Sequence, residues 1–291
     1  MIGKLATRPP RSVWDLLDDA LDLYRMRFLH FAALAAVLYL PVQILGVALS
    51  TGVHAWFLHQ QAGQDKSTSN LISFGELFAQ NGVLQLPLML STLFLSAAVA
   101  QSVWGELHGT IATTPTVLRQ VLRRAPHYLV IGLLCGITNV LAFCFFGMGH
   151  WVTSVLFLTV PATLQLEGVG FWGALRRAKR RQGGSLWLRS LGLLLLTEMV
   201  LGLLYLGTWT LLQFAFDLIP TPTDSDATNR DLRQHTLSAA AGSLCRYLLA
   251  PVSALATSLL YVDLRIRHEA LDLVTAAQEA QIPLAPERSI G

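Results

Sequence analysis

Six long apolar stretches constrain this chain more than any other feature of its sequence. A helix needs about 20 mostly apolar residues to cross roughly 30 Å of hydrocarbon, and all six reach or approach that length. They run approximately from Phe28 to Val53, Val83 to Gly105, Tyr128 to Gly147, Trp151 to Leu166, Leu186 to Phe216, and Leu237 to Val262. The sequence therefore predicts an all-α integral membrane protein with six transmembrane helices arranged as three hairpins.

The composition agrees with a membrane protein and argues against a soluble one. Of the 291 residues, 53% are hydrophobic and only 13% are charged. Soluble domains contain roughly 25% charged residues, so this chain has too few of them to cover a water-exposed surface. We expect a multi-pass protein of the cell membrane.

Positive charge is sorted by the side of the membrane. Of the 21 Lys and Arg residues, seventeen lie in the N-terminal segment, the second loop, the fourth loop with the start of the next span (Arg189), and the C-terminal segment; the opposite loops contain only Lys66, Arg230 and Arg233. The positive-inside rule therefore predicts that both termini are cytoplasmic. This sorting favours the lipid bilayer and its anionic headgroups as partners, with a membrane protein as an open alternative, and argues against nucleic acid.

An amphipathic segment with basic residues near its end precedes each expected hairpin. The three segments are Ala20–Arg27, Val117–Arg124 and Ala174–Arg181. Helices of this kind lie in the interface, with basic residues among the headgroups. We predict a single membrane domain over 1–291, with a threefold internal repeat (units approximately 12–107, 114–168 and 171–263) and a cytoplasmic tail over 264–291.

The first amphipathic segment has a recognisable start. Ser12 followed by Asp15 has the spacing of a capping box, in which each side chain accepts a hydrogen bond from the other residue's backbone. The pattern predicts a helix that begins directly after Ser12.

An acidic residue ends one span of each hairpin: Glu106, Glu167 and Asp263. A carboxylate near the hydrocarbon edge is unfavourable unless it is hydrated or paired, and basic residues follow each of these three. The leading prediction is ion pairing with the interfacial helices. A polar cytoplasmic vestibule and acid–base chemistry with His108 or His268 remain alternatives.

The third amphipathic segment is unusually basic. Five of six consecutive residues carry positive charge: Arg176, Arg177, Lys179, Arg180 and Arg181. Juxtamembrane charge of this kind orients most multi-pass proteins, but this density also suits recognition of anionic lipid or of a partner. Both roles stay open.

Two charges fall inside apolar stretches, Glu198 and Arg246. At 1.5 Å per residue, Glu198 lies about 13 Å along its helix from Arg189, and Arg246 about 25 Å from Asp263 on an antiparallel span. These depths predict a candidate intramembrane pair. Arg246 reaching the outer interface alone, and a substrate or proton pathway, are the alternatives.

No familiar catalytic or cofactor motif occurs. The sequence contains no Walker loop, no GxSxG, no HExxH and no dinucleotide fingerprint, and Cys135, Cys144 and Cys245 lack metal-binding spacing. We therefore expect no catalytic, cofactor-binding or metal-binding residue, and no cofactor.

Three stretches resemble a known bacterial family, the membrane domain named for glycerophosphoryl diester phosphodiesterases. They are Ser12–Phe28, Val160–Ala178 and Leu259–Leu273, and the resemblance extends over nearly the whole chain. It implies a six-span domain in a bacterial inner membrane. In some members this domain precedes a catalytic barrel, which takes about 250 residues. Only about 28 residues follow Asp263, so phosphodiesterase activity is not expected.

The expected function is that of a non-enzymatic scaffold or regulatory membrane component. One alternative is a small transporter or lipid-handling protein that uses Glu198, Arg246 and the cytoplasmic acidic residues. The other is an intramembrane enzyme.

Overall fold

The computed structural model of the protein describes residues 12–61, 88–110, 113–144, 154–155, 157–184, 186–217 and 227–279. Within these ranges all regular structure is helical and no strand occurs. Four of the described helices are long and apolar enough to cross a membrane: Leu40–Gln60, Leu88–Leu107, Leu186–Ala215 and Gln234–His268. The predicted all-α class is confirmed, and the described helices are consistent with a multi-pass membrane protein.

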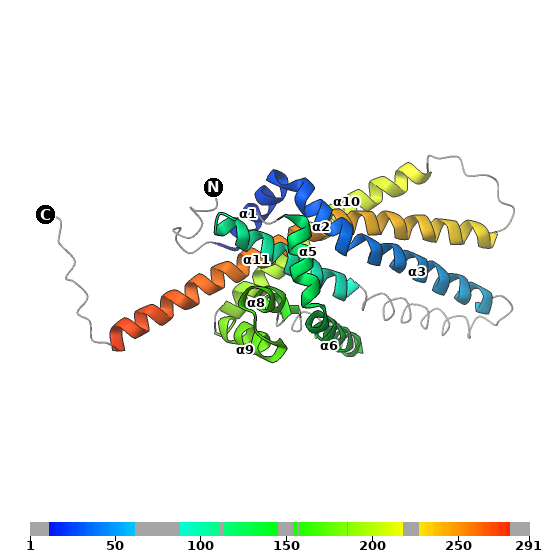
Figure 1. The fold of residues 1–291 in the computed structure, drawn as a ribbon. Helices are drawn as coiled ribbons and strands as arrows, with labels where there is room; N and C mark the ends of the chain where they lie inside the picture. The colour runs from blue at the N-terminus through cyan, green and yellow to red at the C-terminus, as the bar shows by residue number, and fades with distance from the viewer. Residues whose placement is uncertain are drawn as a thin grey trace.

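Figure 1 shows the described helices in their order along the chain. Besides Leu88–Leu107, they are α1 (Val13–Met26), α2 (Phe28–Leu38), α3 (Leu40–Gln61), α5 (Thr114–Arg123), α6 (Ala125–Cys144), α8 (Val160–Glu167), α9 (Phe171–Arg181), α10 (Leu186–Asp217) and α11 (Ala227–Glu279).

The expected capping box begins α1. The Ser12 backbone N–H donates to the Asp15 carboxylate at 2.8 Å, and the Asp15 N–H donates to the Ser12 hydroxyl at 3.1 Å. The apolar face of the helix is buried and consists of Leu16, Leu17, Ala20 and Leu23. This face packs mainly against α11, so α1 is part of the core and not merely a helix resting on the bilayer.

The first expected span, Phe28 to Val53, is divided into α2 and α3 at Tyr39. Pro41 has no backbone N–H and cannot donate to the carbonyl of Val37, which weakens the helix at this point. The Tyr39 N–H still bonds the Ala35 carbonyl at 2.8 Å, so the chain bends with few lost hydrogen bonds. The membrane-crossing part begins at Leu40 and not at Phe28.

Helix α11 is the central element and contacts α1, α2, α3, α8, α9 and α10. It contains Pro251, which lacks the N–H that an α-helix needs and so disturbs the carbonyls one turn earlier. The Tyr24 hydroxyl of α1 donates to one of these carbonyls, that of Leu248, at 2.7 Å. The N–H missing at Pro251 would have bonded the Tyr247 carbonyl, so Tyr24 bonds the neighbouring carbonyl in the turn that the proline distorts.

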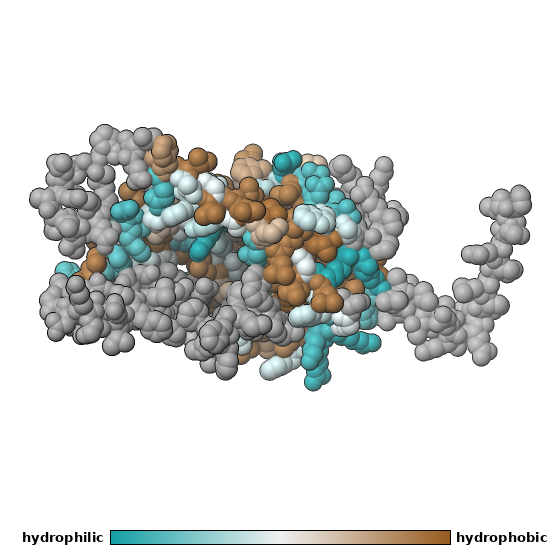
Figure 2. Space-filling view, turned by 180° about the vertical axis from the view of Figure 1, so that it is seen from behind, coloured by the Kyte–Doolittle hydropathy of each residue, from teal (hydrophilic) through white to brown (hydrophobic). Residues whose placement is uncertain are grey.

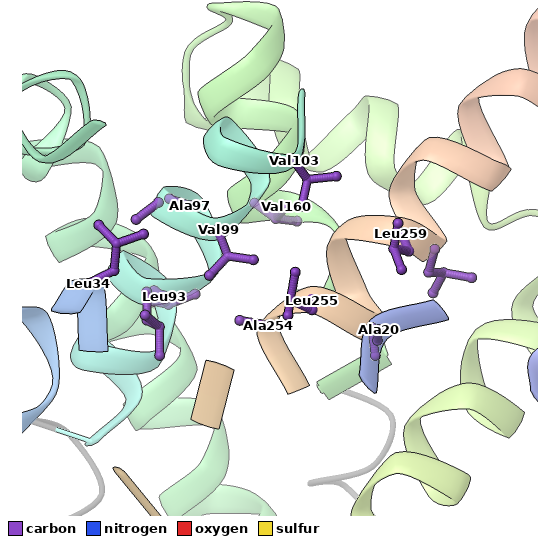
Figure 3. Close-up of a cluster of buried hydrophobic side chains, with 14 of the residues drawn as sticks. Ala20, Leu34, Leu93, Ala97, Val99, Val103, Val160, Ala254, Leu255 and Leu259 are labelled. Carbon is purple, nitrogen blue, oxygen red and sulfur yellow. The ribbon is translucent and has the colours of Figure 1, made fainter. Parts of the chain in front are cut away.

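Small residues allow the central helices to approach closely. Ala97 on Leu88–Leu107 and Ala254 on α11 are fully or almost fully buried, together with Leu34, Val99 and Leu255 (Figure 3). Small side chains at such contacts bring helix backbones close, which compensates for the weak hydrophobic driving force within lipid.

The outer surface is apolar where lipid is expected. Residues of α10 at three- and four-residue steps are 45–64% exposed: Leu195, Met199, Leu203 and Leu206. Figure 2 shows hydrophobic side chains across much of the described outer surface on one face. A face of this kind is typical of a helix that borders hydrocarbon.

The third and fourth expected spans are only partly covered by the described residues. Helix α6 extends over Ala125–Cys144, and its apolar part with described side chains, Ala125–Thr138, is shorter than a span; α8 has only eight residues, Val160–Glu167. The outer turn expected for this hairpin, at residues 148–150, lies outside the described residues. The last helix continues past Asp263 to Glu279, into the segment expected to be a tail.

Candidate functional site

Glu106 lies at the end of Leu88–Leu107 and pairs with Arg27, the residue that separates α1 from α2. The Nε of Arg27 is 2.9 Å from Oε1 of Glu106, whose side chain is only 6% exposed. The carboxylate is thus enclosed by the protein, and its charge is neutralised by a residue from the end of the first amphipathic helix.

Glu167 is held by two residues of α9 and one of α11. Gly168 has a φ of +68°, which turns the chain back so that α9 packs against α8. Arg177 donates to Oε2 of Glu167 at 2.7 Å, Arg181 donates to Oε1, and the Tyr261 hydroxyl donates to Oε1 at 2.7 Å. Burial by itself raises the Glu167 pKa, but these three hydrogen bonds together hold it below its usual value.

Asp263 pairs with two arginines, neither of which lies in an interfacial helix. Arg189 of α10 is 3.0 Å from Oδ2 of Asp263, and Arg267, one turn later on α11, is 2.9 Å from the same oxygen. Next to it, the guanidinium of Arg265 lies 4.8 Å from the centre of the Trp104 ring. This last contact connects α11 to the helix that ends near Glu106.

The structure thus places each carboxylate of the acidic set beside at least one arginine. It also connects the ends of α8 and Leu88–Leu107 to this part of α11, because Tyr261 contacts Glu167 and Arg265 contacts Trp104. We call these contacts the helix-end network. The Nδ1 of His108, considered for acid–base chemistry, donates to the Trp104 carbonyl at 2.8 Å. Vestibule and acid–base roles are not tested by this geometry.

The last arginine of each amphipathic segment reaches a helix end. Arg27 binds Glu106, Arg181 binds Glu167, and Arg124 donates to the carbonyl of Leu164 in the last turn of α8. The three segments therefore share a structural role, because the arginine that closes each one anchors the C-terminal end of another helix.

Helix α9 has two charged faces with different environments. Arg177 and Arg181 face the protein and hold Glu167, next to the buried Ala174 and Ala178. The opposite stripe is exposed and consists of Trp172, Arg176, Lys179 and Arg180. None of these three cations makes a hydrogen bond or ion pair in the described part of the chain. The five-residue basic patch therefore divides into two anchoring residues and three available ones.

Glu198 and Arg246 are not joined in an ion pair among the described residues. Glu198 is exposed on α10, in the apolar outer face described above. Arg246 instead lies with its guanidinium 5.6 Å from the centre of the Tyr205 ring. Both charges lie within electrostatic range of buried Tyr39, at the break between α2 and α3. The two charges therefore lie on neighbouring helices, α10 and α11, without forming the predicted ion pair.

Arg246 borders a cavity that the sequence pattern did not reveal. The lining comes mainly from α3, α10 and α11, with Leu88 from Leu88–Leu107, and includes Gln43, Tyr205 and His235. The sequence did contain a possible signal, because small or polar residues recur at helical spacing in or next to two apolar stretches. The first set is Gln43, Gly46 and Ser50, and the second is His235, Ser238 and Gly242. The sequence does not show which helices are neighbours, so it could not predict that these two sets of residues face the same cavity.

No group of three or more His, Cys, Asp or Glu suited to a metal ion occurs in the described residues. Cys135 and Cys245 are free and buried; the side chain of Cys144 lies outside the described part of the chain.

The sequence matches no family model, and no similar protein is found among curated proteins or solved structures.

Proposed function

We propose that the protein is a non-enzymatic scaffold or regulatory component of a bacterial inner membrane, and that α9 is its contact with anionic lipid headgroups. The observation that carries this proposal is the exposed stripe of Trp172, Arg176, Lys179 and Arg180 beside two arginines that fix the helix to the protein. An amphipathic helix with tryptophan and unpaired cations on its outer face suits the headgroup layer.

Its attachment makes α9 a rigid element and not a loose basic tail. Arg177 and Arg181 each contact one oxygen of Glu167, and that carboxylate also binds Tyr261 of the central helix. The three outward cations therefore keep one orientation relative to the spans. Fixed orientation lowers the entropy lost when a headgroup binds, which supports recognition beyond simple topology.

The proposal includes the finer architecture expected from the sequence. In it, six spans form three hairpins, with α6 and the segment that ends in α8 as the second hairpin, and both termini are cytoplasmic. It also retains the resemblance to the glycerophosphoryl diester phosphodiesterase membrane domain. The arginine that anchors a helix end after each amphipathic segment supports the repeat.

The test replaces the outward cations, in the triple variant Arg176→Gln, Lys179→Gln, Arg180→Gln. Each basic residue near an anionic surface contributes about 1 kcal/mol, so three together should change the affinity by roughly 100-fold. Native mass spectrometry of the purified full chain would measure the Kd for phosphatidylglycerol, and for phosphatidylcholine with the same acyl chains. We expect phosphatidylglycerol affinity to fall while phosphatidylcholine affinity stays constant.

A matched control removes the same number of positive charges from the other amphipathic helices, α1 and α5. It is the triple variant Arg25→Gln, Arg119→Gln, Arg123→Gln, in which all three positions are exposed. We expect a clearly smaller loss than in the α9 variant. Equal losses would mean that total charge alone governs lipid binding, which would contradict a specific role of α9. If lipid binding is unchanged but a co-purifying protein is lost, α9 contacts a protein and the lipid proposal is wrong.

A second candidate, a lipid-handling protein or small transporter, is favoured by the cavity at Arg246. Transport would need that cavity to admit a solute from either side of the membrane in turn. Uptake assays in proteoliposomes, with and without an Arg246→Gln substitution, would distinguish a transporter from a scaffold.

A further inference from the structure

A partly open cavity of about 420 Å³ lies between α3, α10, α11 and the first residue of Leu88–Leu107. Its polar lining includes Gln43, Ser50, Tyr205, His235, Ser243 and Arg246. The volume is within the range of small-ligand sites, which is roughly 300–1,000 Å³. Polar groups gathered between apolar helices are unfavourable in lipid unless they serve each other or a ligand.

The charge of the cavity is positive. Arg246 is exposed along its wall, and among the described lining residues none is acidic. The Arg246 guanidinium faces the Tyr205 ring, and the described contacts include no hydrogen bond or ion pair for it. Stacking on an aromatic ring leaves the edge of a guanidinium, with its N–H donors, free for an anion.

Tyr205 is held close to α11 by the absence of a side chain at Gly242. A Cβ at Gly242 would lie 2.7 Å from the Tyr205 hydroxyl, closer than real contacts allow. Gly242 and Arg246 are four residues apart and so lie on the same face of α11. The tyrosine therefore covers both positions, with its hydroxyl at Gly242 and its ring beneath Arg246.

Gln43 supplies a further donor. Its side chain is 4% exposed and lines the cavity, and its Nε2 has no hydrogen-bond partner among the described residues. A buried amide without a partner is destabilising, and such groups in native structures usually have a reason to be retained. A primary amide and a guanidinium facing the same space are both donors, which suits an acceptor-rich anion.

We propose that this cavity binds a phosphate-type anion, with Arg246 as counter-ion and Gln43 as a second donor. Phosphate accepts paired hydrogen bonds from a guanidinium, and its other oxygens remain available to an amide. The lining also has an apolar part, which includes Val47, Leu206 and Trp209, and α10 exposes leucines next to it. These surfaces suit the acyl chain of an anionic lipid, whereas a free phosphate ion would use only the polar part. The site is separate from α9 and does not depend on the function proposed for it.

The experiment measures thermal stabilisation of the purified full chain by three probes: palmitoyl lysophosphatidylglycerol, lysophosphatidylcholine with the same chain, and inorganic phosphate. All measurements use the Arg176→Gln, Lys179→Gln, Arg180→Gln background, so that α9 does not contribute. A ligand that binds only the folded state raises the Tm in a concentration-dependent way, which yields an apparent Kd. Stabilisation by the anionic lysolipid but not by phosphate assigns the anion to a lipid; stabilisation by phosphate as well assigns it to a solute. Equal stabilisation by the choline lipid, or none by any probe, overturns the proposal.

Two substitutions locate the site. Arg246→Gln should weaken binding by about 10- to 100-fold, the range expected for losing hydrogen bonds to a charged group. Gln43→Leu should weaken binding by about 5- to 10-fold but raise the Tm without ligand, because it removes an unpartnered buried amide. If Arg246→Gln does not fold, the ligand affinity of Gln43→Leu still tests the site. Unchanged ligand affinity in both variants would refute a site at this cavity.

Discussion

At the scale of single residues, Glu167 is the most strongly supported carboxylate of the helix-end network. It accepts hydrogen bonds from Arg177, Arg181 and Tyr261, and these contacts lower its pKa. A carboxylate with a lowered folded-state pKa stabilises the fold fully above its unfolded pKa. That contribution is lost as the pH falls through the lower folded-state value.

We therefore predict that Glu167→Gln destabilises the protein at pH 7 by about 2 kcal/mol, since hydrogen bonds to a charged group are lost while Gln retains the size of Glu. The difference in Tm between wild type and variant should shrink as the pH falls below the usual carboxyl pKa of 4.5. Thermal unfolding in detergent from about pH 3 to 8 would measure it. A difference that is independent of pH would show that the ionised carboxylate is not what Arg177 and Arg181 hold.

The sequence indicated some of these residues and could not indicate others. Glu106, Glu167 and Asp263 were recognisable because each ends an apolar stretch. Arg189 and Tyr261 were not, because their contacts with Asp263 and Glu167 depend on how α8, α10 and α11 pack. Helical rise gave Glu198 and Arg246 similar depths, but depth leaves rotation about the helix axis undetermined.

At the scale of elements, periodicity and capping were sufficient for the amphipathic helices. Each of α1, α5 and α9 is present where the pattern placed it. Boundaries were harder, because a charge does not by itself end a helix. No Gly or Pro lies between Asp263 and Glu279, so α11 continues beyond its charged residues. Pro41, in contrast, ended α2 early.

The contact between α1 and α11 near Pro251 gives a second prediction. Tyr24→Phe removes the hydrogen bond to the Leu248 carbonyl and should lower stability by about 1 kcal/mol. In a Pro251→Ala background the regained N–H bonds the Tyr247 carbonyl and the proline ring no longer crowds this turn, so the neighbouring Leu248 carbonyl bonds more strongly within α11. The effect of Tyr24→Phe should then be smaller. A double-mutant cycle on thermal stability would measure this coupling, and strict additivity would show that Pro251 does not matter to Tyr24.

At the scale of the whole molecule, the number of predicted spans can be compared with the helices in the structure. Stretches of about 20 apolar residues predict six spans, and the described residues contain four helices of sufficient length and hydropathy. The difference lies in α6, whose side chains are described only as far as Thr138, and in α8, which has eight residues; both adjoin residues outside the described ranges. Apolar composition alone could not show how this part of the chain is arranged.

Orientation can be tested by cysteine accessibility in a variant whose three native cysteines are replaced by Ala. Cys135 and Cys245 are buried, so their replacement affects packing and not labelling of the surface. Single cysteines at Ser67 and Thr223 should be labelled from outside intact cells. Cysteines at Arg119 and Lys179, both exposed, should be labelled only after permeabilisation. Labelling of position 179 in intact cells would contradict the predicted orientation.

The contact between Tyr24 and Leu248 also has a consequence for the order in which the helices are synthesised and packed. The two residues are 224 positions apart in the sequence. At about 5–20 residues per second, a ribosome needs roughly 11 to 45 s to synthesise the intervening chain. During that interval the buried face of α1 has been made but its main neighbour, α11, has not. A helix that is synthesised early is therefore among the last to reach its final environment. Until then, a chaperone, the insertion machinery or the membrane surface must shelter Leu16, Leu17 and Ala20.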